Sequence, residues 1–278
     1  MKVSANGLDH HALAWGTSGP TVILVHGYMD AAGTWDRVAP ALADAGFRVF
    51  ALDMRGFGEG PRVPRGGYYH FADYVFDLAD IVDALSPDAP VMLVGHSMGG
   101  TINTLYTGTY PERVSKLVSM EGLGPPDNPY EMGPHRMRAW IDGVRKMRDR
   151  EPGTLSREEA RRRLAGNHPN VPADVLDSRF PHLVKDMGDG RVAWRFDPLH
   201  RTTSPMPFFT ALFREFAKKV ACPVLYVSGG PTGWHPPDEE ERLAAYPNLV
   251  RTEIADAGHM MHWTRPDEVA RFLVAHLR

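Results

Sequence analysis

The stretch Val-Met-Leu-Val-Gly-His-Ser-Met-Gly-Gly at residues 91–100 constrains the fold of this chain more than any other. An apolar run ends in Gly-x-Ser-x-Gly, and residues 101–110 have the pattern of a helix. A strand, a tight turn and a helix in this order form a nucleophile elbow, whose strained backbone exposes the serine hydroxyl. Larger side chains at Gly95 and Gly99 would collide with the neighbouring strand and helix. The sequence therefore predicts that Ser97 is a nucleophile.

Further strand candidates alternate with helical segments along the chain. Alternating residues around Asn6-Gly7 predict a hairpin over residues 2–15. Most other candidates are short apolar runs, which are typical of parallel strands buried on both faces. These runs lie at 22–25, 49–52, 91–94, 114–120, 224–227 and 250–255. Helical patterns lie at 35–45, 71–85, 101–110, 239–246 and 267–277. The pattern predicts an α/β fold with a doubly wound, mostly parallel, eight-stranded sheet.

One interval interrupts this alternation, between the strand candidates at 114–120 and 224–227. It begins with a proline-rich joint and contains four helical patterns, which lie at 134–150, 156–165, 173–185 and 207–218. Because a stretch of this length must be structured, we expect a helical cap at 123–219, inserted into a core formed by 1–122 and 220–278. The first part of the cap is rich in arginine, but interspersed carboxylates favour a solvated face over an anion-binding patch.

Composition argues against several classes of function. A formal net charge of −3, without a long basic run, disfavours a nucleic-acid partner. Residues 1–7 lack the apolar stretch of a secretory signal, and no segment approaches the length of a membrane span. We therefore expect a cytoplasmic protein without a membrane partner. The absence of His-Glu-x-x-His or paired-cysteine spacing predicts no metal site, and no cofactor is expected. Nothing in the sequence indicates an oligomeric state.

A serine hydroxyl becomes a good nucleophile when a base removes its proton, and the base is usually a histidine held by a carboxylate. His259 directly follows the strand candidate at 250–255 and precedes the terminal helix, so we expect it to be the base. His262 is expected to pack beside the site.

An oxyanion hole needs two backbone N–H groups that point at the developing negative charge. One is expected from Met98, the residue after the nucleophile, and the other from Tyr28, because His26-Gly27 turns the chain there.

These motifs together resemble those of the α/β-hydrolase family. They are His26-Gly27, the Asp-Met-Arg-Gly-Phe-Gly run at 53–58, the run at 95–100, and Gly258-His259, in the family's order and spacing. The resemblance covers residues 1–120 and 220–278, whereas the cap matches only in its placement. Such motifs are specific for the superfamily and say little about the substrate.

The chain departs from the common family pattern in the position of the acid. The acid usually follows the strand after the cap, but the strand at 224–227 is followed by a glycine-rich loop without a carboxylate. Glu121 instead stands at the end of the strand at 114–120. This Met-Glu ending resembles the haloalkane dehalogenase and coelenterazine-luciferase branches, which take their acid from this strand. We expect Glu121 to be the acid, with Asp238 as the alternative, although Asp238 is more simply interpreted as a helix cap.

The nucleophile restricts the chemistry. Dehalogenases and epoxide hydrolases of this family use an aspartate, whereas attack by Ser97 on an alkyl carbon would leave an ether that water cannot open. The chain looks most like serine-hydrolase-like and carboxylesterase members. This resemblance implies a cofactor-free serine hydrolase that cleaves a carboxylic ester or lactone through an acyl-serine, on a largely apolar small-molecule substrate. Alternatives are thioester, amide or C–C bond hydrolysis with the same triad, a low-turnover ligand-binding protein, and a lyase or oxygen-using enzyme.

Several other residues are ambiguous from sequence. The aromatic segment at 66–71 either lines the pocket mouth or is buried beneath the following helix. Asp30 could touch a substrate or cap the turn that follows it. Asp53 and Arg55 are expected to hold each other. The cap aromatics are more often core than substrate lining; they are Trp140, Trp194, Phe196, Phe208, Phe209 and Phe213.

Overall fold

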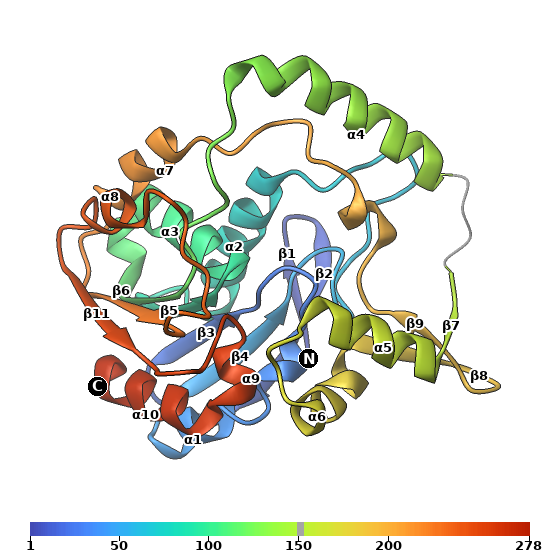
Figure 1. Ribbon diagram of the computed structural model, residues 1–278. Helices are drawn as coiled ribbons and strands as arrows, with labels where there is room; N and C mark the ends of the chain where they lie inside the picture. The colour runs from blue at the N-terminus through green and yellow to red at the C-terminus, as the bar shows by residue number, and fades with distance from the viewer. Residues whose placement is uncertain (149–152) are drawn as a thin grey trace.

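The structure is a computed structural model that describes residues 1–148 and 153–278. Eight strands form one sheet in the order β1-β2-β4-β3-β5-β6-β10-β11, with helices on both of its faces (Figure 1). The strands are β1 (Lys2–Ala5), β2 (Leu8–Trp15), β3 (Thr21–Val25), β4 (Arg48–Asp53), β5 (Val91–His96), β6 (Val114–Met120), β10 (Val224–Ser228) and β11 (Leu249–Glu253). β2 pairs antiparallel with β1 and β4, and the other pairs are parallel. The predicted eight-stranded α/β sheet is confirmed.

Hydrophobic burial on both faces explains why the central strands are uninterrupted apolar runs. Every residue of β3 and β10 is buried. One core cluster lies between the sheet and helices α2 (Phe71–Leu85) and α3 (Met98–Thr109). A second lies on the opposite face beneath helices α1 (Ala39–Asp44) and α10 (Pro266–Leu277). The hairpin prediction holds, because Asn6 and Gly7 both have positive φ, 48° and 68°, as a two-residue turn of this kind requires.

Two predicted helices are shorter than expected. The segment predicted as a helix at 35–45 forms a 3₁₀ turn, η1 (Ala32–Trp35), and then α1, whose first turn contains Pro40. The helix expected at 239–246 ends early as α8 (Glu239–Leu243). Short elements follow α3 and precede α10, namely η2 (Pro111–Arg113) and α9 (Met261–Thr264).

The interval between β6 and β10 contains more than helices. Its elements are η3 (Tyr130–Met132), α4 (Gly133–Arg148), β7 (Leu155–Ser156), α5 (Arg157–Asn167), α6 (Ala173–Leu183), β8 (Val184–Gly188), β9 (Arg191–Trp194), η4 (Pro198–Arg201) and α7 (Thr210–Ala217). The sequence missed the small antiparallel sheet in the order β7-β9-β8, because its strands are short and mostly exposed. The helix predicted to reach residue 150 is described to Arg148, and Asp149 and Arg150 lie outside the described residues.

This interval is attached to the sheet unevenly. No residue of α4 is buried, whereas α7 packs tightly on α3: a Cβ added at Gly108 would lie 2.4 Å from the Phe216 carbonyl oxygen.

The arginines of α5 pair with carboxylates, as in Arg161 with Asp177 at 3.2 Å. Within the described residues, no helix has both the length and the hydropathy needed to cross a bilayer.

Candidate active site

Ser97 lies in a sharp turn between β5 and α3. Its backbone has φ 50° and ψ −117°, a left-handed conformation that is rare for a residue with a side chain. The flanking glycines make this turn possible. A Cβ at Gly95 would lie 2.4 Å from the Gly100 nitrogen, and one at Gly99 would lie 2.2 Å from the Val25 carbonyl oxygen. The turn is therefore a nucleophile elbow in its geometry, as the motif predicts.

Glu121 and His259 are in direct contact. Glu121 follows β6 with φ 49°, and its side chain is fully buried. Its Oε2 atom lies 2.7 Å from His259 Nδ1. The same carboxylate accepts hydrogen bonds from the backbone N–H groups of Gly229 and Trp234, each at 2.6 Å. Three N–H groups thus surround a buried carboxylate, which fixes its orientation toward His259.

The loop after β10 is built to enclose this carboxylate. Because the loop passes directly over Glu121, a Cβ at Gly233 would lie 2.0 Å from Glu121 Oε1. A Cβ at Gly229 would lie 2.1 Å from the Gly258 carbonyl oxygen. The absence of a carboxylate in this loop therefore has a physical reason: the loop holds a carboxylate that the neighbouring strand supplies.

Asp238, the alternative acid, lies elsewhere. It occupies the N-cap position of α8 but makes no side-chain cap hydrogen bond, so the expectation that it caps this helix is wrong. Its Oδ1 atom accepts from Arg242 Nε at 2.8 Å. Arg242 is fully buried and also donates to the carbonyl oxygens of Leu123, Gly124 and Pro125. The carboxylate of Asp238 thus compensates the positive charge of Arg242, whose guanidinium binds the backbone carbonyls of residues 123–125 after β6.

A cavity of about 500 Å³ brings Ser97, Glu121 and His259 together. The other lining residues are Tyr28, Tyr68, Tyr69, Phe71, Tyr74, Met98, Thr101, Gly124, Pro125, His200, Thr202, Ser204 and Trp234. The aromatic segment at 66–71 therefore lines the cavity, whereas the six cap aromatics singled out from the sequence do not. In the described part of the chain, the Ser97 hydroxyl makes no hydrogen bond to His259. Such a bond is often long before a substrate binds.

Tyr28 and Met98, the residues expected to supply the two oxyanion donors, also line this cavity. Neither Tyr28 N nor Met98 N donates to a backbone carbonyl among the described residues. His26 fixes the loop that carries Tyr28. Its Nε2 accepts the Met54 N–H at 3.2 Å, so its Nδ1 carries the proton and donates to the Gly27 carbonyl at 2.7 Å. The Gly27–Tyr28 peptide is trans, so its C=O and N–H bonds point in opposite directions. Because the Gly27 carbonyl is bound to His26, the Tyr28 N–H points away from the His26 ring.

His200 lines the cavity and was not recognised as a site residue from the sequence. It stacks on Phe57 with ring centroids 4.0 Å apart and on Tyr69 at 4.2 Å. Burial, assisted by the positive charge of Arg62, lowers the pKa of His200 to about 3, so its ring is neutral at pH 7. Its backbone carbonyl accepts a hydrogen bond from the Tyr28 hydroxyl. No local pattern could reveal this residue, because its partners are remote in sequence.

One other expectation is corrected. Asp53 and Arg55 do not hold each other: Asp53 accepts the N–H groups of Ala32 at 2.7 Å and Glu59 at 3.0 Å, whereas Arg55 pairs with Asp77. For Asp30 two roles were open, and its contacts favour the one in the following turn: the buried carboxylate accepts from Ala31 N and Thr34 Oγ1, both at 2.8 Å.

One group of three described side chains has the spacing of metal ligands, although no motif in the sequence predicts a metal site. It consists of Asp30, His96 and His262, whose ligand atoms lie within 4.8 Å of one another. Their wide separation along the chain explains why spacing motifs did not reveal them.

Comparisons with known proteins find a matching family model, relatives and similar structures. A family model described as alpha/beta hydrolase fold matches residues 20–266. A serine hydrolase-like protein of Dictyostelium discoideum is 32% identical over 120 residues, which are 42% of this chain and 33% of that protein. Lipase LipV of Mycobacterium tuberculosis is 27% identical over 284 residues, covering 97% of this chain and 98% of the lipase. The crystal structure of a hypothetical protein of Pseudomonas aeruginosa superposes with a TM-score of 0.87 at 25% identity, covering 100% of this chain and 98% of the other.

The chain spans less than two thirds of the length of several curated relatives that it matches, including the Dictyostelium protein.

Proposed function

The chain belongs to the alpha/beta hydrolase fold family, and on this premise we propose that it is a serine hydrolase that cleaves a carboxylic ester or lactone. The observation that carries this proposal is the buried contact of 2.7 Å between Glu121 and His259, at the wall of the cavity that also exposes Ser97. A carboxylate on Nδ1 leaves Nε2 of the same ring free to accept a proton from the serine. Lipase LipV, which aligns over nearly its whole length, supports a hydrolase of this type.

In the proposed reaction, Ser97 Oγ attacks the carbonyl carbon while its proton moves to His259 Nε2. The Tyr28 and Met98 N–H groups stabilise the oxyanion that forms. When the C–O bond to the leaving group breaks, His259 returns the proton to the departing oxygen and an acyl-serine remains. Water then attacks the acyl-serine by the same steps, releases the acid and restores Ser97. Glu121 keeps His259 oriented and stabilises its imidazolium form throughout.

The lining of the cavity supports an uncharged, largely apolar small-molecule substrate. Apart from Glu121 and His259, the lining side chains are uncharged. Six of them are aromatic, namely Tyr28, Tyr68, Tyr69, Phe71, Tyr74 and Trp234. Desolvation raises the pKa of the Tyr28 hydroxyl to about 12, so this group also stays uncharged. A charged substrate would lose its hydration here without gaining an opposite charge.

The test is the intact mass of the protein after treatment with a fluorophosphonate, which requires only an activated serine and an oxyanion hole. We expect one adduct on the wild type and none on Ser97→Ala. A panel of neutral esters, lactones and thioesters then separates the possible carbonyl substrates. A folded wild type that gains no adduct would contradict the proposal and favour a protein that binds a ligand without turnover.

A further inference from the structure

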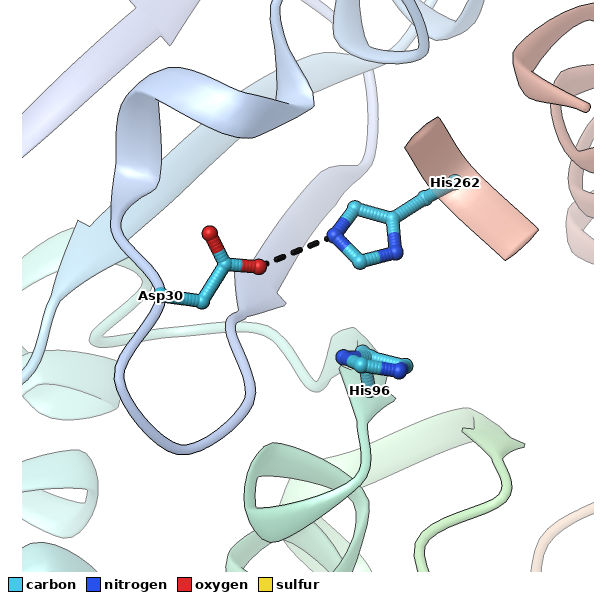
Figure 2. Close-up of side chains that lie close together, drawn as sticks. All are labelled: Asp30, His96 and His262. Atoms are coloured by element: carbon cyan, nitrogen blue, oxygen red, sulfur yellow. Dashed lines mark hydrogen bonds and ion pairs between the residues drawn. The ribbon is translucent and has the colours of Figure 1, made fainter. Parts of the chain in front are cut away.

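A second group of polar side chains lies directly behind the candidate active site. Figure 2 shows Asp30, on the loop after β3, facing His262 on α9, with His96 at the end of β5 beside them. All three are buried, with exposed fractions of 3% for Asp30, 1% for His96 and 0% for His262. None of them lines the cavity that contains Ser97. They cannot touch a substrate there, so any effect on the reaction must pass through other residues.

Asp30 joins two loops of the proposed site. Its Oδ1 atom accepts from Ala31 N and Thr34 Oγ1, both at 2.8 Å, and so holds the loop that follows Tyr28. Its Oδ2 atom accepts from His262 Nε2 at 3.0 Å. Although burial opposes ionisation, the hydrogen bonds from His262 and Thr34 lower the pKa of Asp30. Burial lowers the pKa of His262, so a neutral ring donates its one proton to a carboxylate.

His96 connects this pair to the base. Its Nε2 atom lies 2.8 Å from the His259 carbonyl oxygen and therefore donates to it. The His96 ring lies 4.5 Å from that of His262 and 4.7 Å from that of His259, measured between centroids. On its other edge, His96 Nδ1 faces Gly27, where a Cβ would approach to 2.6 Å. The ring thus lies between the loop of the expected oxyanion donor and the segment that carries the base.

The arrangement has an energetic cost that simple packing would avoid. His96 Nδ1 and His262 Nδ1 are buried and have no hydrogen-bond partner among the residues that the structure describes. Buried polar atoms without partners destabilise a fold, and apolar side chains of similar shape would remove this cost. His262 also stacks on Trp35, with ring centroids 4.7 Å apart, so an aromatic hydrocarbon would fit the same space. His262 and His96 thus keep polar contacts, to Asp30 and to the His259 carbonyl oxygen, where apolar rings would pack at a lower cost.

We infer that Asp30 and His262 are positioning residues that, together with His96, fix the oxyanion loop relative to the segment bearing His259. This inference rests on the proposed hydrolase function. The buried hydrogen bond spans 232 positions of sequence and directly links the two loops. Because α9 begins two residues after His259, a shift of His262 is transmitted to the base over a very short stretch of chain.

The test compares two variants of one position. His262→Phe keeps the ring volume and the stack on Trp35 but removes the N–H that Asp30 accepts. We expect kcat for an ester to fall about 10- to 100-fold with little change in KM, because a small misplacement of reacting groups is this costly. His262→Gln places an amide N–H near the position of Nε2, so it should recover most of the lost kcat.

A matched control uses a second buried imidazole. His10 on β2 is also 0% exposed and lies 3.7 Å from the Asp77 carboxylate, but it does not line the cavity. His10→Phe should leave kcat unchanged, whatever it does to the thermal midpoint. An equal loss of kcat in His10→Phe, or a normal kcat in His262→Phe, would overturn the positioning role. Failure of His262→Gln to recover activity above His262→Phe would do so as well.

Two further measurements separate this inference from its rivals. Fluorophosphonate labelling of the wild type is done first: without an adduct the proposed function fails and the inference fails with it, whereas a labelled wild type with a normal His262→Phe contradicts the positioning role alone. Dialysis of the wild type against EDTA tests the metal-like spacing of the three side chains. Unchanged kcat supports the positioning role, and a loss that zinc restores would overturn it in favour of a metal site.

Discussion

The ends of two neighbouring strands, β6 and β10, differ in what they supply to the site. β6 ends in Glu121, whose carboxylate reaches His259, whereas β10 ends in a glycine-rich loop that supplies backbone N–H groups. The common pattern of the family places the acid after the strand that β10 represents. The two strands are hydrogen-bonded neighbours, and Glu121 N donates to the Val227 carbonyl at 3.1 Å. The comparison teaches that the position of the carboxylate next to the histidine ring matters more than the strand that carries it. A residue after either strand can reach this position when the loop after the other strand is small enough to accommodate the side chain.

The strongest test of this division is Glu121→Gln. A neutral amide cannot stabilise the imidazolium form of His259, so kcat should fall by about 1,000- to 10,000-fold, while the fold persists. Ester turnover and the thermal midpoint, measured on the same preparation, check this outcome. A loss smaller than about tenfold would mean that the carboxylate at the end of β6 is not the acid.

Gly233→Ala tests the loop after β10 without changing any polar group. Its methyl group would lie 2.0 Å from Glu121 Oε1 and must displace the loop or the carboxylate. We expect kcat to fall about 10- to 100-fold, since displacement of the acid misorients the base. Gly166→Ala is the matched control, because a Cβ there meets nothing within 4 Å. Equal activity of the two variants would show that the loop yields easily and that the close fit has no consequence.

Trp234→Ala separates the backbone of this loop from its side chain. The variant keeps the N–H that Glu121 accepts but loses an aromatic wall of the cavity. We expect KM for an aromatic ester to rise about 5- to 30-fold, which corresponds to about 1 to 2 kcal/mol of lost apolar contact, with kcat nearly unchanged. Steady-state kinetics with an aromatic and a short aliphatic ester distinguish the two effects. A fall in kcat with unchanged KM would instead indicate that the indole holds the loop in place.

Asp238→Asn should have the smallest effect on activity. Asp238 pairs with the buried Arg242 rather than with His259, so kcat should change by less than about twofold. Stability should fall by about 1.5 to 3 kcal/mol, because a charged hydrogen bond to a buried guanidinium is weakened. Denaturant unfolding measures the second effect. A loss of kcat as large as that of Glu121→Gln would reverse the assignment of the acid.

The sequence predicted best those features that depend on neighbours along the chain. Apolar runs identified the buried strands because burial on both faces leaves no room for polar residues, and β6 was predicted with its observed bounds. The glycines around Ser97 reflect contacts within one turn. By contrast, the helix predicted at 173–185 extends into the first two residues of β8, and the exposed remainder of that strand carries no strand pattern.

Side-chain partners were harder to predict than elements. Asp53 and Arg55 are two positions apart, but each is bonded to a different segment. Asp30 and His262 meet only because β3 and β5 are adjacent in the sheet and the chain after β11 returns over them. The glycines at 229, 230 and 233 were the one available signal that something must fit beneath the loop after β10.

The left-handed backbones of Ser97 and Glu121, with φ of 50° and 49°, have a consequence for protein engineering. Each conformation costs about 1 to 3 kcal/mol for a residue with a side chain, and glycine would relieve that cost. A library screened only for heat resistance would therefore enrich glycine at positions 97 and 121, although the proposed reaction requires the side chains of both residues. Directed evolution of this chain should select for turnover and thermal tolerance in the same round, or keep both codons fixed.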